Sequence, residues 1–140
     1  MNVLIVEDDE QGRRFLCGVV EHHWPDARIV QAVDGKTALK LFAQHPPHVT
    51  LLDIELPKLN GLDVLEIMRA FRRDAFIVMV SGNSSMENVK TATDVGIDGF
   101  LVKPFDERKV VEILQRYTRS HEHHASKVAV VGQGKSVSWD

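Results

Sequence analysis

Short apolar runs alternate with longer amphipathic stretches along most of the chain. The runs lie at 3–6, 49–52, 76–80 and 100–102, and each is almost wholly apolar at consecutive positions. Such runs are typical of strands that helices cover on both faces. The segment 28–32 is more mixed in polarity, and we therefore expect it to be an edge strand.

Helical periodicity fills the intervals between these runs. Apolar residues recur at helical spacing in 10–22, 35–44, 61–71 and about 106–118. Ser84-Ser85-Met86-Glu87 resembles a capping box that opens a further helix ending before Gly96. The strand–helix unit thus occurs five times, which predicts an α/β fold with a parallel sheet between helices.

The character of the chain changes after Ser120. His121-Glu122-His123-His124 is polar, and Gly132-Gln133-Gly134-Lys135 lies between two segments that each begin with valine, Val128–Val131 and Val137–Trp139. Residues 120–140 are therefore either a small hairpin or a C-terminal tail or linker. We expect one domain over 1–119 and this tail after it.

Composition narrows the class of protein. The 140 residues carry 17 Lys and Arg against 20 Asp and Glu, a net charge of −3 that argues against a general nucleic-acid binder. The longest apolar runs are far shorter than the roughly 20 residues that span a bilayer, and no basic leader precedes the first strand. Cys17 is the only cysteine and fits a reducing compartment. These features predict a cytoplasmic protein without membrane contact.

Polar residues that could carry chemistry follow four of the predicted strands. Glu7, Asp8 and Asp9 follow the first run, Asp53 follows 49–52, Ser81 follows 76–80, and Lys103 follows 100–102. The carboxyl ends of parallel strands meet at one edge of the sheet, where ligands bind in such folds. Carboxylates that share Mg²⁺, a hydroxyl and an ammonium group together suit a phosphoryl ligand.

Each of these residues also has a simpler explanation. The acidic residues 7–9 could cap the following helix, Ser81-Gly82 could form a turn, and Lys103-Pro104 could precede a helix as a solvated pair. It is improbable that a group suited to a phosphoryl ligand would follow each of four buried strands by chance. We therefore interpret the set as one site.

The motifs of the chain resemble those of a known family. They are Val3-Leu4-Ile5-Val6-Glu7-Asp8-Asp9, Leu51-Leu52-Asp53-Ile54-Glu55-Leu56-Pro57-Lys58-Leu59-Asn60-Gly61, Val80-Ser81-Gly82 and Gly99-Phe100-Leu101-Val102-Lys103-Pro104-Phe105. In this order and spacing they are similar to the receiver domain of two-component response regulators, over residues 1–119. The resemblance implies a flavodoxin-like fold, with a five-stranded parallel sheet in the order 2-1-3-4-5 and helices on both faces.

The resemblance also implies roles at the acidic residues. Asp53 would be the phosphoacceptor. Asp8, Asp53 and the backbone carbonyl of Glu55 would bind Mg²⁺ directly, and Glu7 would act through water. Glu55 and Asn83 match positions that tune the lifetime of the phosphoryl group in this family.

The remaining positions would form the switch. Lys103 would hold a phosphoryl oxygen, and its bond to Pro104 is commonly cis in this family. Ser81 would move toward the phosphoryl group, and Phe100, which stands where many members have Tyr, would rotate inward. These movements would change the face formed by the fourth helix, fifth strand and fifth helix.

The implied partners are a sensor histidine kinase or a histidine phosphotransfer protein, and a downstream protein or an output domain outside this chain. Homodimerisation on phosphorylation is a further expectation, and no direct nucleic-acid contact is expected for this chain. The domain would be a switch with self-phosphorylation and self-dephosphorylation chemistry rather than an enzyme that turns over a substrate.

Two other classes remain open at this point. Asp53-Ile54-Glu55 superficially resembles the Asp-x-Asp motif of haloacid-dehalogenase-type phosphatases, although that motif belongs after the first strand of a larger domain. The chain could also be a receiver that is never phosphorylated and serves only as an interaction module. His121, His123 and His124 lack partners at metal-binding spacing, and a solvated segment explains them better.

Overall fold

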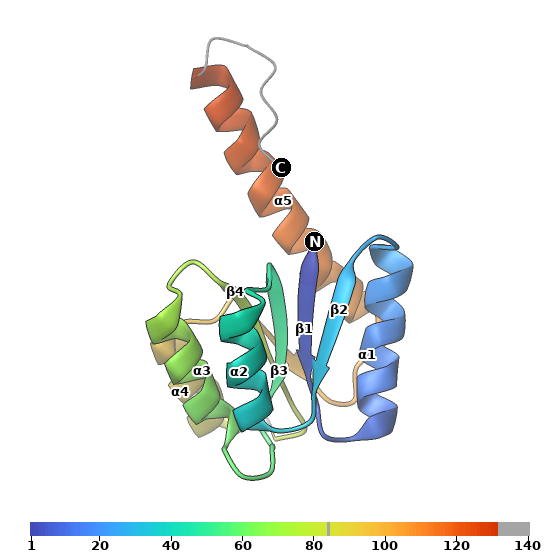
Figure 1. Cartoon of the computed structure of the whole chain (residues 1–140), viewed down its shortest axis with the longest axis vertical. Helices are drawn as coiled ribbons and strands as arrows, with labels where there is room; N and C mark the ends of the chain where they lie inside the picture. The colour runs from blue at the N-terminus through green and yellow to red at the C-terminus, as the bar shows by residue number, and fades with distance from the viewer. Residues whose placement is uncertain (84, 132–140) are drawn as a thin grey trace.

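The computed structural model describes residues 1–83 and 85–131. Strands and helices alternate along the chain (Figure 1). The elements are β1 (Asn2–Val6), α1 (Glu10–His23), β2 (Arg28–Ala32), α2 (Gly35–Gln44), β3 (Val49–Asp53), α3 (Gly61–Phe71), β4 (Phe76–Ser81), α4 (Met86–Val95), β5 (Gly99–Val102) and α5 (Glu107–Val131).

All five strands pair in parallel, in the order β2-β1-β3-β4-β5. This topology confirms the predicted flavodoxin-like fold, and the mixed segment Arg28–Ala32 is an edge strand as expected. Because the strands are parallel, their carboxyl ends lie along one edge of the sheet. The strand order reverses direction between β1 and β3, so a crevice for ligands is expected beyond these two strands.

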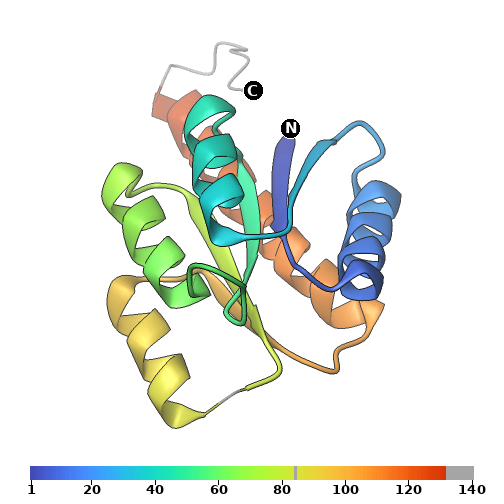
Figure 2. The same cartoon turned by 60° about the horizontal axis from the view of Figure 1, so that its bottom comes forward.

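The core has two layers, one on each face of the sheet. Successive side chains of a strand point to opposite faces. Val3 and Ile5 in β1 pack with residues of α1 and α5, whereas Leu4 and Val6 pack with residues of α2, α3 and α4. Figure 2 shows α1 and α5 on one side of the sheet and the other three helices on the opposite side. Burial on both faces explains why the inner strands are apolar at consecutive positions.

Short polar side chains begin the helices. The Asp9 carboxylate accepts a hydrogen bond from the Gly12 N–H at 2.8 Å, so Asp9 is the N-cap of α1. Ser85 is the N-cap of α4, and its hydroxyl oxygen accepts from the Asn88 N–H at 3.2 Å. The N-cap is therefore one residue later than the Ser-x-x-Glu spacing of Ser84 and Glu87 predicts, and the residue three positions after Ser85 is Asn88 rather than the Glu or Gln of a capping box.

Helix α5 is longer than expected. It continues to Val131 and extends past the end of the sheet in Figure 1. Val128–Val131, which would be one strand if residues 120–140 formed a hairpin rather than a tail or linker, is helical, so the hairpin alternative does not hold for these residues. No glycine or proline interrupts the chain between Glu107 and Val131, so the helix can propagate one bond at a time through β-branched residues of modest propensity. Residues 132–140, with the second predicted strand, lie outside the described residues.

Within the described part of the chain, every helix falls short of the length or the apolar character that crossing a membrane requires.

Candidate functional site

Polar residues gather at the carboxyl ends of four adjacent strands. Glu7 and Asp8 follow β1, Asp53 ends β3, Ser81 ends β4, and Lys103 follows β5. Glu7 and Asp53 are each only 1% exposed, and Ser81 is fully buried. Burying carboxylates costs free energy unless charges or hydrogen bonds compensate. The fold therefore brings together the group that the strand ends predicted, in an electrostatic setting typical of a functional site.

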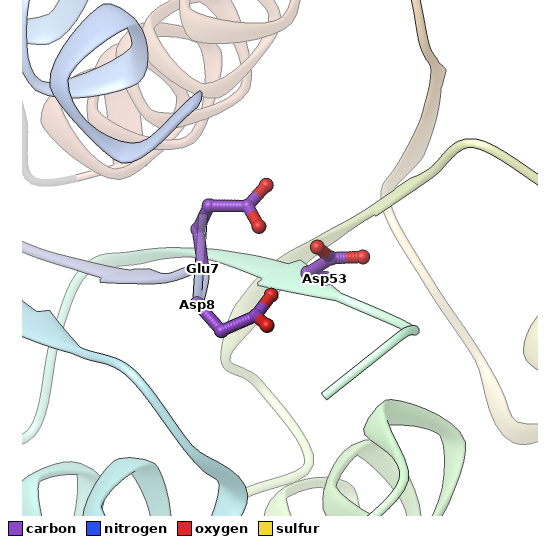
Figure 3. A group of neighbouring side chains, drawn as sticks. All are labelled: Glu7, Asp8 and Asp53. Atoms are coloured by element: carbon purple, nitrogen blue, oxygen red, sulfur yellow. The ribbon is translucent and has the colours of Figure 1, made fainter. Parts of the chain in front are cut away.

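Three carboxylates face one another at this edge. Glu7, Asp8 and Asp53 each present an oxygen, and these atoms lie within 4.8 Å of one another. Figure 3 shows the three side chains projecting from the ends of β1 and β3 into the same space. Carboxylate oxygens are preferred ligands of hard divalent cations. The trio could hold a metal ion, with the exposed Asp8 on the solvent side.

Lys103 joins the two buried carboxylates. Its Nζ lies 2.8 Å from Glu7 Oε1 and 3.0 Å from Asp53 Oδ2. The second oxygen of each carboxylate accepts a backbone hydrogen bond: Asp53 Oδ1 from the Glu55 N–H at 3.0 Å, and Glu7 Oε2 from the Asp9 N–H at 3.1 Å. Both carboxylates are thus held at both oxygens, which fixes their orientation before any ligand arrives.

The proximity of two buried acids shifts their titration in opposite directions. Burial, followed by the hydrogen bond to Glu7, raises the pKa of Asp53 to about 7 against the opposing effect of Lys103. Burial also acts to raise the pKa of Glu7, but hydrogen bonds with Asp53, Lys103 and the Asp9 N–H outweigh it, and the pKa of Glu7 is lowered. Two like charges at this distance resist joint ionisation. A bound cation would stabilise the ionised forms of both carboxyl groups and so allow Glu7 and Asp53 to be charged at the same time.

Ser81 is held by the Glu55 side chain. The Ser81 hydroxyl donates to Glu55 Oε2 at 2.7 Å, and the Gly82 N–H donates to Glu55 Oε1 at 3.1 Å. The hydroxyl also lies 2.9 Å from the Asn83 carbonyl oxygen and accepts from the Asn83 N–H at 2.9 Å. Sequence reasoning singled out Glu55, Ser81 and Asn83 separately but missed their direct contacts. Residues 26 positions apart, as Glu55 and Ser81 are, carry no local signal of such a bond.

The other predicted residues lie where their motifs placed them. The Lys103–Pro104 peptide bond is cis, as the resemblance implied. Phe100 lies in β5, half-buried against the core layer on the side of α2, α3 and α4. Its rotation, like the tuning roles of Glu55 and Asn83, stays a prediction.

Comparison with known proteins agrees with this geometry. The chain is 28% identical to the chemotaxis protein CheY of Halobacterium salinarum over 112 residues, which are 80% of this chain and 92% of that protein. It is 28% identical to the regulatory protein AtoC of Escherichia coli over 137 residues, 98% of this chain but 29% of AtoC. The chain thus spans nearly all of one relative and less than a third of the other.

A solved structure with the same fold is also similar in sequence. It is the N-terminal domain of a protein from Wolinella succinogenes, which superposes with a TM-score of 0.80 at 31% identity, covering 89% of this chain and 98% of that domain. The family model of the response regulator receiver domain matches residues 3–115. With Asp53 at the end of the third strand of this sheet, the phosphatase alternative is not supported. The chain belongs to the response regulator receiver domain family.

Proposed function

We propose that this domain accepts a phosphoryl group on Asp53 from a phosphohistidine donor, with Mg²⁺ bound, and then presents a changed α4–β5–α5 face to a partner or output domain. The observation that carries the proposal is the position of Lys103 Nζ between the buried carboxylates of Glu7 and Asp53. An ammonium group there can neutralise phosphoryl oxygens as they arrive at Asp53. The donor would be a histidine kinase or a phosphotransfer protein.

The residues of the site divide the chemistry among them. A carboxylate oxygen of Asp53 would attack phosphorus, the bond from phosphorus to the imidazole nitrogen of the donor would break, and an acyl phosphate would form. Lys103 would turn from Asp53 Oδ2 toward a phosphoryl oxygen. Ser81 and the Gly82 N–H would supply hydrogen-bond donors on the side of β4. Since the acyl phosphate is later hydrolysed on the same residue, the domain would act as a timed switch.

The residues present fit Mg²⁺. The ion commonly keeps several waters and binds one or two carboxylates together with phosphate oxygens. Asp8 and Asp53 would provide the carboxylates, and Glu7, the third member of the acidic trio, would act through water. The Glu55 backbone carbonyl is the further ligand that the family resemblance implies. When bound, Mg²⁺ would neutralise negative charge on the phosphoryl oxygens and the acidic trio.

Mg²⁺ binding is expected to weaken about tenfold between pH 8 and pH 6. The pKa of Asp53 is raised to about 7 by burial and by Glu7, so at pH 6 most molecules carry a proton that the ion must displace. Isothermal titration calorimetry at the two pH values, in buffers of different ionisation enthalpy, would measure both affinity and proton release. Equal affinities at pH 6 and pH 8 would contradict this prediction.

The first test is intact mass after incubation with acetyl phosphate. The chain is expected to gain one phosphoryl group, about 80 Da by the chemistry of acyl-phosphate formation, only when Mg²⁺ is present. Asp53→Asn is the matched control, because it keeps the size of the side chain but removes the nucleophile. A magnesium-dependent adduct on wild type and none on the variant would support the proposal.

Other outcomes would overturn it. The same adduct on Asp53→Asn would put the phosphoryl group on another residue. No adduct with either acetyl phosphate or fluoroberyllate would favour a receiver that serves only as an interaction module. Phosphorylation-dependent dimerisation through the α4–β5–α5 face is a separate proposal, and sedimentation of the fluoroberyllate complex would test it.

A further inference from the structure

The Glu55 carboxylate accepts hydrogen bonds from two donors of the site. Its Oε2 accepts from the Ser81 hydroxyl at 2.7 Å and its Oε1 accepts from the Gly82 N–H at 3.1 Å. Hydrogen bonds to an ionised carboxylate are shorter and stronger than neutral ones. Ser81 is fully buried, so its hydroxyl can exchange this acceptor only for another group of the site.

Both donors lie on the side of the site where phosphoryl oxygens would be. A phosphoryl group carries several strong acceptor oxygens and negative charge, as the carboxylate does. The Ser81 hydroxyl has a single proton, and it cannot donate fully to Glu55 and to a phosphoryl oxygen at once. The Glu55 carboxylate and a phosphoryl group at Asp53 would therefore compete for the same two donors, the Ser81 hydroxyl and the Gly82 N–H.

We propose that Glu55 is an internal competitor of the phosphoryl group, and that its carboxylate holds Ser81 and Gly82 in the unphosphorylated arrangement until phosphorylation displaces it. The inference rests on the proposed function, since it concerns how the same site is regulated. Glu55 is a positioning residue in this scheme. It opposes phosphorylation through Ser81 and Gly82 and also steadies Asp53, whose Oδ1 accepts from the Glu55 N–H.

The same bonds link the competitor to α4. While the Ser81 hydroxyl donates to Glu55, its oxygen accepts a hydrogen bond from the Asn83 N–H at 2.9 Å. Asn83 in turn accepts from the Asn88 side chain at 3.3 Å through its carbonyl, and from the Ser85 N–H at 3.1 Å through its side chain. Ser85 is the N-cap of α4. Release of Ser81 from Glu55 would thus change the hydrogen bonds at the start of α4, which is one element of the proposed output face.

The test measures the affinity of fluoroberyllate in the presence of Mg²⁺ for the wild-type chain and for Glu55→Ala. Removing the competitor is expected to tighten binding on the order of tenfold, comparable to one charge-assisted hydrogen bond. Glu55→Gln keeps an acceptor oxygen without the charge and should give an intermediate affinity. Glu66→Ala on α3 removes one exposed acidic side chain outside the site and should bind as wild type does.

A double-mutant cycle separates competition for donors from plain charge repulsion. In a Ser81→Ala background the Glu55 carboxylate has lost its main donor, and Glu55→Ala should tighten fluoroberyllate binding by no more than about threefold. The backbone ¹⁵N–¹H resonance of Gly82, recorded without Mg²⁺ or fluoroberyllate, should shift when Glu55 is replaced by alanine. This shift reports the contact itself and does not depend on phosphorylation.

The outcomes distinguish the two proposals. Wild type that binds fluoroberyllate, with no tightening in Glu55→Ala, would overturn the competitor role and leave the proposed function intact. If Glu55→Ala tightened fluoroberyllate binding equally with and without the Ser81→Ala substitution, charge repulsion would explain the effect instead. A Gly82 resonance that does not shift in Glu55→Ala would show that Glu55 does not contact the Gly82 N–H. Absence of fluoroberyllate binding in every variant would overturn the proposed function and the competitor role with it.

Discussion

Gly61→Ala is expected to lower the free energy of unfolding by about 3 kcal/mol, at the upper end of the cost of overpacking a core. A Cβ atom at this position would overlap the carbonyl oxygen of Asp53 and lie 2.6 Å from the Cα of Ile54. Both are backbone atoms and cannot turn aside as a flexible side chain would. The Gly61 N–H also donates to the Ile54 carbonyl at 2.8 Å, so α3 and the end of β3 would have to separate.

This separation would act directly on Asp53, the proposed phosphoacceptor. Moving the backbone of Asp53 changes the position of its carboxylate relative to Lys103, and we expect phosphorylation by acetyl phosphate to slow together with the loss of stability. Urea unfolding and the rate of adduct formation measure the two effects. Gly18→Ala is the matched control. A Cβ there meets nothing within 4 Å, and alanine inside α1 should stabilise by about 0.5–1 kcal/mol.

A loss below about 1 kcal/mol in Gly61→Ala, on the scale of an ordinary substitution, would contradict this account of the close approach.

Lys103→Met is expected to destabilise the magnesium-free protein by about 3 kcal/mol at pH 8, as expected when a buried charge loses its partner. The variant keeps the apolar stem of the side chain but leaves Glu7 and Asp53, each 1% exposed, without the ammonium group between them. Without Lys103 the pKa of both carboxyls should rise, because burial and mutual repulsion are no longer offset.

The sign of the pH dependence follows from this rise. A carboxyl group whose folded-state pKa lies above its unfolded value destabilises the fold progressively as pH rises from the unfolded value, near 4, through the folded one. The pKa of Asp53 is already raised to about 7 with Lys103 present. The loss caused by Lys103→Met should therefore be smaller at pH 5.5, where the acids can take up protons, than at pH 8.

Urea unfolding at the two pH values, in the presence of a chelator, measures this difference. Lys90→Met is the matched control, because Lys90 pairs with Asp94 at 2.8 Å on the exposed face of α4 and such surface pairs contribute little. Equal destabilisation by Lys103→Met at pH 5.5 and pH 8 would refute a charge-compensating role for Lys103. Phosphorylation should also slow, on the order of a hundredfold for loss of one electrostatic stabiliser.

Some features of this protein follow from local sequence alone. The consecutive apolar residues of β1, β3 and β4 identify strands buried on both faces, and parallel pairing then brings Glu7, Asp53, Ser81 and Lys103 to one edge. Both inferences can be made from the sequence, because consecutive apolar residues indicate a strand that is buried on both faces. The carboxyl ends of parallel strands also lie at the same edge of the sheet. The order of the motifs along the chain was sufficient to indicate the receiver family.

Other features depended on how loops fold back across the sheet. Lys103 contacts Asp53 from 50 positions away, and Glu55 reaches Ser81 across the gap between β3 and β4. The direction of a side chain beyond a strand end depends on loop backbone that is not periodic, so only the tertiary structure reveals these bonds. The length of α5 differs from the prediction for a related reason. Valines at 128, 130 and 131 favour strands, but a strand needs a partner, whereas a helix already begun at Glu107 satisfies its own backbone as it grows.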